Sequence, residues 1–266
     1  MKKLALSLMM SLFVLMIAAC GANQEESNEN ATEQEQGNAK IEKLTVGTEG
    51  TYAPFTFHNE EGELTGYDVE VIKEVAKRMG AEVEFMETQW DSMFAGLNSK
   101  RFDLIANQVG INEDRLANYD FSTPYTYSSS VIVTPTETDD ITSFEDLEGK
   151  KSAQSLTSNY GAIAEENGAE LVGVEGLAQS IQLIKQGRAD VTVNDKLAVL
   201  DYMKNQNDKD VKIVAESDDV SEMAFTFNKG NEELVEAVNE QLAAMKEDGT
   251  LTKISQEWFG EDVSTK

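Results

Sequence analysis

The sequence predicts an α/β fold with two lobes joined by a two-strand hinge. Between Lys43 and Val214, short β-like runs alternate with amphipathic helical runs, as in α/β architectures with largely parallel sheets. Residues 41–266 are a long span for a single core and suit two lobes of roughly a hundred residues each. A further β-like run follows the second α/β series, so we expect the second lobe to be inserted into the first.

Residues 1–19 have the features of a secretory signal peptide. Lys2 and Lys3 precede an apolar run from Leu4 to Ile17, which is shorter than the ~20 residues that a helix needs to cross a bilayer. The next residue, Cys20, is the only cysteine, and "IAAC" resembles the lipobox of bacterial lipoproteins. We therefore expect Cys20 to carry diacylglycerol and palmitate, and we expect no disulfide, thiol catalysis or Cys-ligated metal.

Residues 20–40 are expected to form a disordered tether after the lipidated cysteine. They are rich in Asn, Gln and Glu and nearly free of apolar residues, so they cannot bury enough surface to offset the entropy of ordering. The formal net charge of −27 repels phosphate backbones, and no basic patch with interleaved aromatics is present. The composition therefore predicts a soluble surface and no nucleic-acid partner. We also expect a monomer.

The first lobe is predicted to begin with a βαβαβ series. "KLTVGT" alternates apolar and polar residues as a strand does. From Asp68 to Met79 the apolar residues fall on one helical face, and Gly80 follows as a stop signal. "AEVEFMET" and "FDLIAN" are the next expected strands, with a short helix beginning near Asp91 between them.

The second lobe is predicted to begin after "SSSVIVTP" and the polar stretch "TETDD". Its strands are "KKSAQS", "ELVGVE", "ADVTVN" and "VKIVAE", and "MAFTFNKG" returns to the first lobe. Connections around Ser130 to Thr134 and Met223 to Phe227 would form the hinge. We therefore assign 41–131 and 226–266 to lobe 1 and 132–225 to lobe 2. The remaining expected helices are 158–166, 176–186, 195–205, 232–246 and 251–259.

"GYDVEVIKEVAKRM", residues 66–79, resembles the signature of the family 3 extracellular solute-binding proteins, which are polar amino-acid receptors of ABC importers. "GTYAPFTF", "WDSMFAGL", "DRLANYDFSTPY", "FEDLEGKK" and "MKEDGTLTKISQEWFG" follow in the family's order and approximate spacing. The resemblance implies a type II periplasmic-binding-protein-like fold, a bilobed clamp that closes over one small ligand. It also implies no cofactor.

The resemblance further implies that Arg115 pairs with the α-carboxylate of an amino acid. A guanidinium is a planar fork that matches a carboxylate with two parallel charge-assisted bonds. The alternative is a solvated arginine that pairs with Glu113 or Asp114 at the surface. Related receptors usually have Thr or Ser five residues earlier, where this chain has Gly110, so the carboxylate would lose one side-chain hydrogen bond here.

By the same resemblance, Asp195 accepts the ligand's ammonium group, although an Asp at this strand-to-helix boundary would also serve as an N-cap. Thr157 and Ser158 open a helix whose free N–H groups and dipole suit a carboxylate, and simple capping is again the alternative. Tyr52 and Trp90 match positions where the family sandwiches the ligand's side chain, whereas most aromatics are core residues.

Two short segments narrow the choice of amino-acid ligand. "EGTYAPF" with Glu49, and "NQV" with Asn107 and Gln108, resemble the cystine-binding subgroup more than the glutamine, histidine or basic amino-acid subgroups. Cystine has two zwitterionic ends, and Glu49 with the two carboxamides would receive the charged and polar groups of one of them. L-Cystine is therefore the expected ligand.

The expected function is a non-catalytic receptor, lipid-anchored at the extracellular face of the bacterial cell membrane, that delivers its ligand to an ABC permease. His58 is the only histidine and lies in a polar turn, so a Ser-His-Asp triad and a His-based metal site lack parts. Two alternatives remain open: a prephenate or arogenate dehydratase-like enzyme on the same scaffold, and a ligand sensor for a membrane partner.

Overall fold

The computed structural model describes residues 41–266. The predicted signal peptide, the Cys20 lipidation site and the tether lie outside the described residues. Within residues 41–266, no helix is long and apolar enough to cross a membrane.

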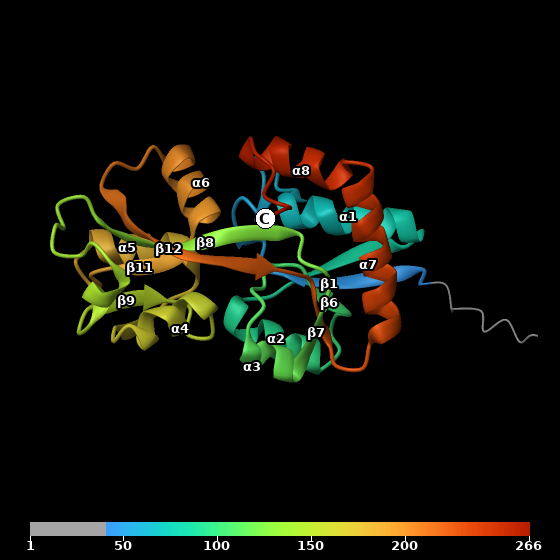
Figure 1. The fold of residues 1–266 in the computed structure, drawn as a ribbon, viewed down its shortest axis with the longest axis horizontal. Helices are drawn as coiled ribbons and strands as arrows, with labels where there is room; N and C mark the ends of the chain where they lie inside the picture. The colour runs from blue at the N-terminus through green and yellow to red at the C-terminus, as the bar shows by residue number, and fades with distance from the viewer. Residues whose placement is uncertain (1–40) are drawn as a thin grey trace, which may run out of the picture. The chain divides into compact units, whose positions relative to one another are not determined.

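One half of the described chain, here lobe 1, is built on a five-stranded sheet (Figure 1). Two of its strand pairs are parallel, and the strand that comes from late in the chain is antiparallel to both of its neighbours. This late strand confirms that the chain returns to the first sheet after the second α/β series. In sheet order the strands are β5 (Glu82–Glu87), β1 (Lys43–Thr48), β6 (Leu104–Ile105), β13 (Thr226–Asn228) and β7 (Tyr119–Phe121).

Helix α1 (Tyr67–Met79) shows why the sequence pattern folds as it does. Val71, Ile72 and Val75 lie on its apolar face and are fully buried, and Gly80 ends the helix in a left-handed conformation with φ 72°. Two C-terminal helices pack against α1. The other elements of lobe 1 are α2 (Trp90–Asn98), α3 (Glu113–Asn118), α7 (Glu232–Glu247), α8 (Thr250–Phe259) and a small sheet of β2 (Thr51–Tyr52), β3 (Thr56–His58) and β4 (Leu64–Thr65).

The other half, lobe 2, combines a parallel strand pair with three α-helices. Ile132, Val191 and Val193 are fully buried in its core. Its elements are η1 (Phe144–Leu147), β9 (Lys151–Gln154), α4 (Asn159–Glu166), β10 (Glu170–Gly173), α5 (Gly176–Lys185), β11 (Thr192–Asp195) and α6 (Lys196–Gln206).

Two long antiparallel strands run between the halves, β8 (Thr126–Pro135) and β12 (Val211–Met223) (Figure 1). The expectation of largely parallel sheets is wrong for the small sheet β2-β3-β4 and for the long-stranded sheet β11-β8-β12, in both of which every pairing is antiparallel. For β11-β8-β12 the physical reason is the chain path, because one long strand enters lobe 2 and the other leaves it in the opposite direction. The two-strand connection is confirmed, and the lobe boundaries near residues 131 and 225 stay predictions.

The helix predictions are confirmed with ends within one residue, and Ser158 and Asp195 serve as N-caps of α4 and α6 instead of first helical residues. Helix α3 is absent from the sequence prediction. It has only six residues, and its start is signalled by Asn112, whose side chain accepts a hydrogen bond from the backbone N–H of Arg115.

Candidate ligand-binding pocket

A pocket lies between the two lobes. It encloses about 460 Å³ of space between atoms, part of it open to solvent. Lobe 1 contributes Glu49, Tyr52, Trp90, Asn107 and Gln108, and lobe 2 contributes Gln154, Ser155, Ser158, Asn159, Tyr160, Gly176, Leu177, Ser180 and Asn194.

The structure therefore brings most of the predicted site residues together and leaves some outside. The predicted residues that line the pocket are Glu49, Tyr52, Trp90, Asn107, Gln108 and Ser158. The predicted residues that do not line it are Gly110, Arg115, Thr157 and Asp195.

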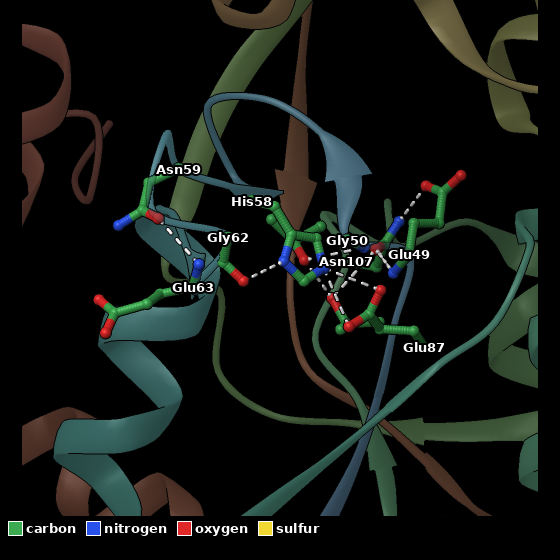
Figure 2. A network of polar contacts seen from close by, with 10 residues as sticks. Glu49, Gly50, His58, Asn59, Gly62, Glu63, Glu87 and Asn107 are labelled. Atoms are coloured by element: carbon green, nitrogen blue, oxygen red, sulfur yellow. Dashed lines mark hydrogen bonds and ion pairs between the residues drawn. The ribbon is translucent and has the colours of Figure 1, made fainter.

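Glu49 follows β1 and is, among residues 41–266, the only acidic residue that lines this pocket. Its Oε2 accepts a hydrogen bond of 2.6 Å from Nδ2 of Asn107, whose Oδ1 accepts 2.7 Å from the Glu49 backbone N–H (Figure 2). Burial raises the pKa of the Glu49 carboxyl to about 7, and the charges of Glu175 and Asp91 act in the same direction. A cation at this wall would favour the ionised form.

His58 supports the turn that carries Glu49. Its Nε2 lies 3.0 Å from both carboxylate oxygens of Glu87, and its Nδ1 lies 3.0 Å from the Gly62 carbonyl oxygen (Figure 2). The Glu87 carboxylate in turn packs on Gly50, where a Cβ would come within 2.6 Å of Oε2. The only histidine is thus at the surface, as expected, and its contact with Glu87 supports the turn that carries Glu49.

Gln108 is held in a left-handed backbone conformation with φ 48°. Oδ2 of Asp68 accepts its backbone N–H at 2.6 Å, and its side-chain Nε2 donates to Oδ1 of Asp68 at 2.6 Å and to Oγ1 of Thr126 at 3.0 Å. Oε1 of Gln108 is buried without a hydrogen-bond partner among the described residues. Asp68 is fully buried, and burial raises its pKa to about 7.

Trp90 places a donor at the same pocket. Its Nε1 is buried and has no hydrogen-bond partner within residues 41–266. The Trp90 ring lies at the start of α2. This helix can lie close to β1 because Gly47 of β1 and Gly96 of α2 leave room for the ring of Phe102. A Cβ on Gly47 would come within 2.5 Å of the Phe102 ring, and a Cβ on Gly96 within 2.7 Å. Two residues of the pocket wall thus carry a buried polar atom without a partner in the described part of the chain: the donor Nε1 of Trp90 and the acceptor Oε1 of Gln108.

Arg115 is buried beside the pocket, with 8% of its surface exposed. Nη1 donates to the Gly110 carbonyl at 2.9 Å and Nη2 to the Thr157 carbonyl at 3.5 Å, and the guanidinium carbon lies 5.4 Å from the centre of the Trp90 ring and 5.3 Å from that of Phe94. Burial lowers its pKa to about 10.

No ion pair of the described chain includes Arg115, so pairing with its neighbours Glu113 and Asp114 is not observed. The side chain lines a second hollow that shares Ser158 and Asn159 with the first pocket. A buried cation without a carboxylate is unfavourable, so this position favours the arrival of an anion.

Asp195 is fully buried behind the pocket wall. Its Oδ1 accepts the backbone N–H groups of Leu197 at 2.7 Å and Ala198 at 3.3 Å, which is the N-cap role that the sequence offers as the alternative. Its Oδ2 accepts 3.3 Å from the hydroxyl of Tyr160, a residue of the pocket wall. Burial raises the pKa of Asp195 to about 6.

Ser158 and Thr157 lie at the N-terminal end of α4 and differ in their partners. Oγ of Ser158 accepts the Gly161 N–H at 2.9 Å and caps the helix. Thr157 turns to lobe 1, where Oδ1 of Asp91 accepts its hydroxyl at 2.7 Å and its N–H at 3.1 Å. Across the pocket, the Tyr52 hydroxyl donates to Oδ1 of Asn194 at 2.8 Å.

Sequence reasoning missed most of the lobe 2 wall. Ser155 and Asn194 had a usable signal, because each lies at or just after the end of a strand, where ligand sites of α/β folds gather. Gly176, Leu177 and Ser180 had none, since the first turns of α5 face the pocket only through the tertiary arrangement. Residues 41–266 contain no group of three or more His, Cys, Asp or Glu that could hold a metal ion.

Comparison with known proteins places this geometry in a family. Residues 44–261 match the bacterial extracellular solute-binding proteins, family 3. The L-cystine-binding protein TcyA of Bacillus subtilis is 57% identical over 269 residues, 99% of this chain and all of the relative. The L-cystine solute receptor of Neisseria gonorrhoeae, in an unliganded open conformation, is 52% identical, with 86% of this chain and 97% of the receptor covered and a TM-score of 0.57.

A more distant structure is more similar in shape. An ancestral arginine-binding protein bound to arginine is only 36% identical, yet its TM-score is 0.78, with 83% of this chain and all of that chain covered. The described arrangement of the lobes is therefore nearer to a ligand-bound relative than to an open one. The family match spans nearly all of residues 41–266, and the Bacillus relative aligns with 99% of the chain, so this chain belongs to the bacterial extracellular solute-binding proteins of family 3.

Proposed function

We propose that this protein is the extracellular receptor of an amino-acid ABC importer and that it binds L-cystine in the pocket between its lobes. The names of relatives support the ligand, since TcyA of Bacillus subtilis and the receptor of Neisseria gonorrhoeae are both L-cystine binders by name. Delivery to a permease follows from the family.

The observation that carries the proposal is a pair of opposite charges, one on the pocket wall and one buried beside the pocket. Arg115 is a buried guanidinium without an acidic partner among the described residues, and Glu49 is the single acidic residue of the pocket wall. A zwitterion offers a carboxylate to the first and an ammonium group to the second. Both groups gain an oppositely charged partner that the described residues do not supply, so an amino acid is the complementary ligand.

Cystine suits the remaining wall. The aromatic rings of Tyr52 and Trp90 offer faces on which a disulfide packs favourably. The opposite wall carries the neutral polar side chains of Gln154, Ser155 and Asn194, which suit the second head group without adding a net charge. In this proposal Arg115 pairs with a carboxylate of the ligand at the border of the two hollows, and Asp195 acts indirectly, by positioning the Tyr160 hydroxyl. The predicted residues that contact the ligand are Glu49, Tyr52, Trp90, Asn107, Gln108 and Ser158.

The proposal extends to location and partners. Cys20 carries the lipid anchor that keeps the receptor at the extracellular face of the membrane, and the receptor works as a monomer without catalysis. The support is the lipobox-like segment before Cys20 and the transport names of the relatives.

Calorimetric titration of the purified protein with L-cystine, glutamine, arginine and histidine tests the ligand. We expect L-cystine to bind most tightly. If glutamine or arginine binds most tightly and L-cystine gives no heat, the proposed ligand is wrong. Incubation with prephenate or arogenate, followed by product detection, tests the enzymatic alternative, and we expect no product.

A further inference from the structure

One contact joins the two lobes outside the pocket. Asp91 lies in the first turn of α2 in lobe 1, and Thr157 precedes α4 in lobe 2. Oδ1 of Asp91 accepts both the hydroxyl and the backbone N–H of Thr157, at 2.7 and 3.1 Å. Neither residue lines the first pocket, and Thr157 lines the second hollow together with Arg115.

Electrostatics explains why a carboxylate occupies this position. The N-terminal ends of α2 and α4 both meet at the contact, and each helix N-terminus carries a partial positive charge. Two such ends repel each other unless an anion lies between them. Asp91 supplies that anion, and its two hydrogen bonds are charge-assisted and therefore stronger than neutral ones.

Other contacts converge on the same closure. Nη2 of Arg115, also in lobe 1, lies 3.5 Å from the Thr157 carbonyl, so Thr157 is held at its N–H, its hydroxyl and its carbonyl. The Tyr52 hydroxyl and Oδ1 of Asn194 make a second cross-lobe bond of 2.8 Å at the pocket wall. The Asp91 contact is exposed to solvent, so water can replace it when the lobes separate.

We propose that Asp91 is a latch residue, which holds Thr157 and with it lobe 2 against lobe 1 while the ligand is enclosed, and thereby sets the ligand's residence time. The latch rests on the proposed function of the pocket as a ligand site. Its effect belongs to dissociation, because a contact that forms only after the lobes meet slows their separation more than their encounter.

Four substitutions separate the parts of the latch. Asp91→Ala removes the acceptor, and Asp91→Asn keeps an acceptor oxygen but removes the charge between the helix ends. Thr157→Val removes the hydroxyl and keeps the backbone N–H, and Thr157→Ser keeps both donors. Glu60→Ala is the control, since Glu60 is an exposed carboxylate of lobe 1 for which no cross-lobe contact is seen in the described chain.

Stopped-flow displacement of bound L-cystine measures the dissociation rate of each variant. We expect Asp91→Ala to dissociate about 10-fold faster than wild type, because the variant loses both charge-assisted hydrogen bonds of this solvent-exposed contact. Asp91→Asn and Thr157→Val should fall in between, and Thr157→Ser and Glu60→Ala should match wild type. The double variant Asp91→Ala/Thr157→Val should dissociate no faster than Asp91→Ala alone, because both changes break one contact.

An unchanged dissociation rate in Asp91→Ala overturns the latch. Tighter binding in that variant also overturns it, because Asp91 would then compete with a ligand carboxylate for Thr157. Failure of the proposed ligand is a separate result, seen as wild type that gives no heat with L-cystine. In that case the displacement is measured with whichever of glutamine, arginine or histidine gives heat. The dissociation rate of Asp91→Ala with that amino acid then tests the latch independently of the ligand's identity. Circular dichroism of each variant confirms that it is folded.

Discussion

The carboxylate of Asp68 accepts two hydrogen bonds from Gln108, one from its backbone N–H and one from its side-chain Nε2, each at 2.6 Å. These two bonds hold a non-glycine residue at φ 48°. The side-chain Nε2 also donates to Oγ1 of Thr126, so among the described residues only Oε1 of the Gln108 amide lacks a hydrogen-bond partner. A residue from the start of α1 thus fixes the orientation of the Gln108 amide, in a residue that lines the pocket.

Asp68→Asn should destabilise the protein. Asn presents one acceptor oxygen where Asp68 presents two, so a buried donor of Gln108 loses its partner, at a cost of about 1–3 kcal/mol in the free energy of unfolding. Urea denaturation measures it. The matched control is Asp219→Asn, because Asp219 is exposed and its side chain makes no hydrogen bond in the described chain. This control should leave the urea midpoint unchanged. Asp103→Asn is unsuitable, because Asp103 also accepts two hydrogen bonds.

Arg115→Ala should weaken L-cystine binding by roughly 2–5 kcal/mol, the scale for truncating one partner of a buried hydrogen-bonded charge pair. Titration calorimetry measures the loss. The matched control is Arg101→Ala, an exposed arginine of the same lobe, for which no side-chain contact is seen within the described residues. Unaltered binding by Arg115→Ala would show that the guanidinium does not meet the ligand.

Trp90→Phe should cost about 0.5–1.5 kcal/mol of binding free energy, because the change keeps an aromatic ring and removes the Nε1 donor that has no partner within the described protein. Trp258→Phe on α8 is the control, since Trp258 does not line the pocket. Equal affinities for both variants and wild type would mean that Nε1 does not donate to the ligand.

The affinity for L-cystine should fall as the pH is lowered through about 7. The pKa of Glu49 in the free pocket is about 7, and pairing with an ammonium group requires the ionised carboxylate, so below that pH binding must first release a proton. The expected loss approaches tenfold per pH unit. Titrations from pH 5.5 to 8.5 measure it, and Glu49→Gln should flatten the profile. A profile that is equally steep in Glu49→Gln would assign the effect to another group.

Asp195→Ala should lower the free energy of unfolding by about 0.5–2 kcal/mol, because α6 loses its N-cap. It should also weaken binding, since Tyr160 loses the acceptor that positions its hydroxyl at the pocket wall. Asp195→Asn keeps an acceptor for the helix end and should recover most of the stability. Thermal unfolding and calorimetry report the two effects separately, and a change in stability alone would leave Asp195 with a capping role only.

Local features of the sequence predicted the α-helices of the described chain except the six-residue α3. The apolar face of α1 and the stop at Gly80 are encoded within a few residues, as are the caps at Ser158 and Asp195, so propensity and periodicity were enough. The sequence also predicted that Glu49, Asn107 and Gln108 share a site with Tyr52 and Trp90, and all five line one pocket. That prediction came from resemblance, which carries tertiary information that local patterns lack.

The tertiary structure alone decided the partners of the charged groups. Asp68 meets Gln108 across 40 positions and Asp91 meets Thr157 across 66, and nothing near either residue in the sequence marks these contacts. Arg115 became a cation without a carboxylate, and Glu49, Asp68 and Asp195 acquired raised pKa values, because folding removed them from water. Desolvation and cross-lobe hydrogen bonds depend on which surfaces meet, and only the packing of the two lobes fixes that.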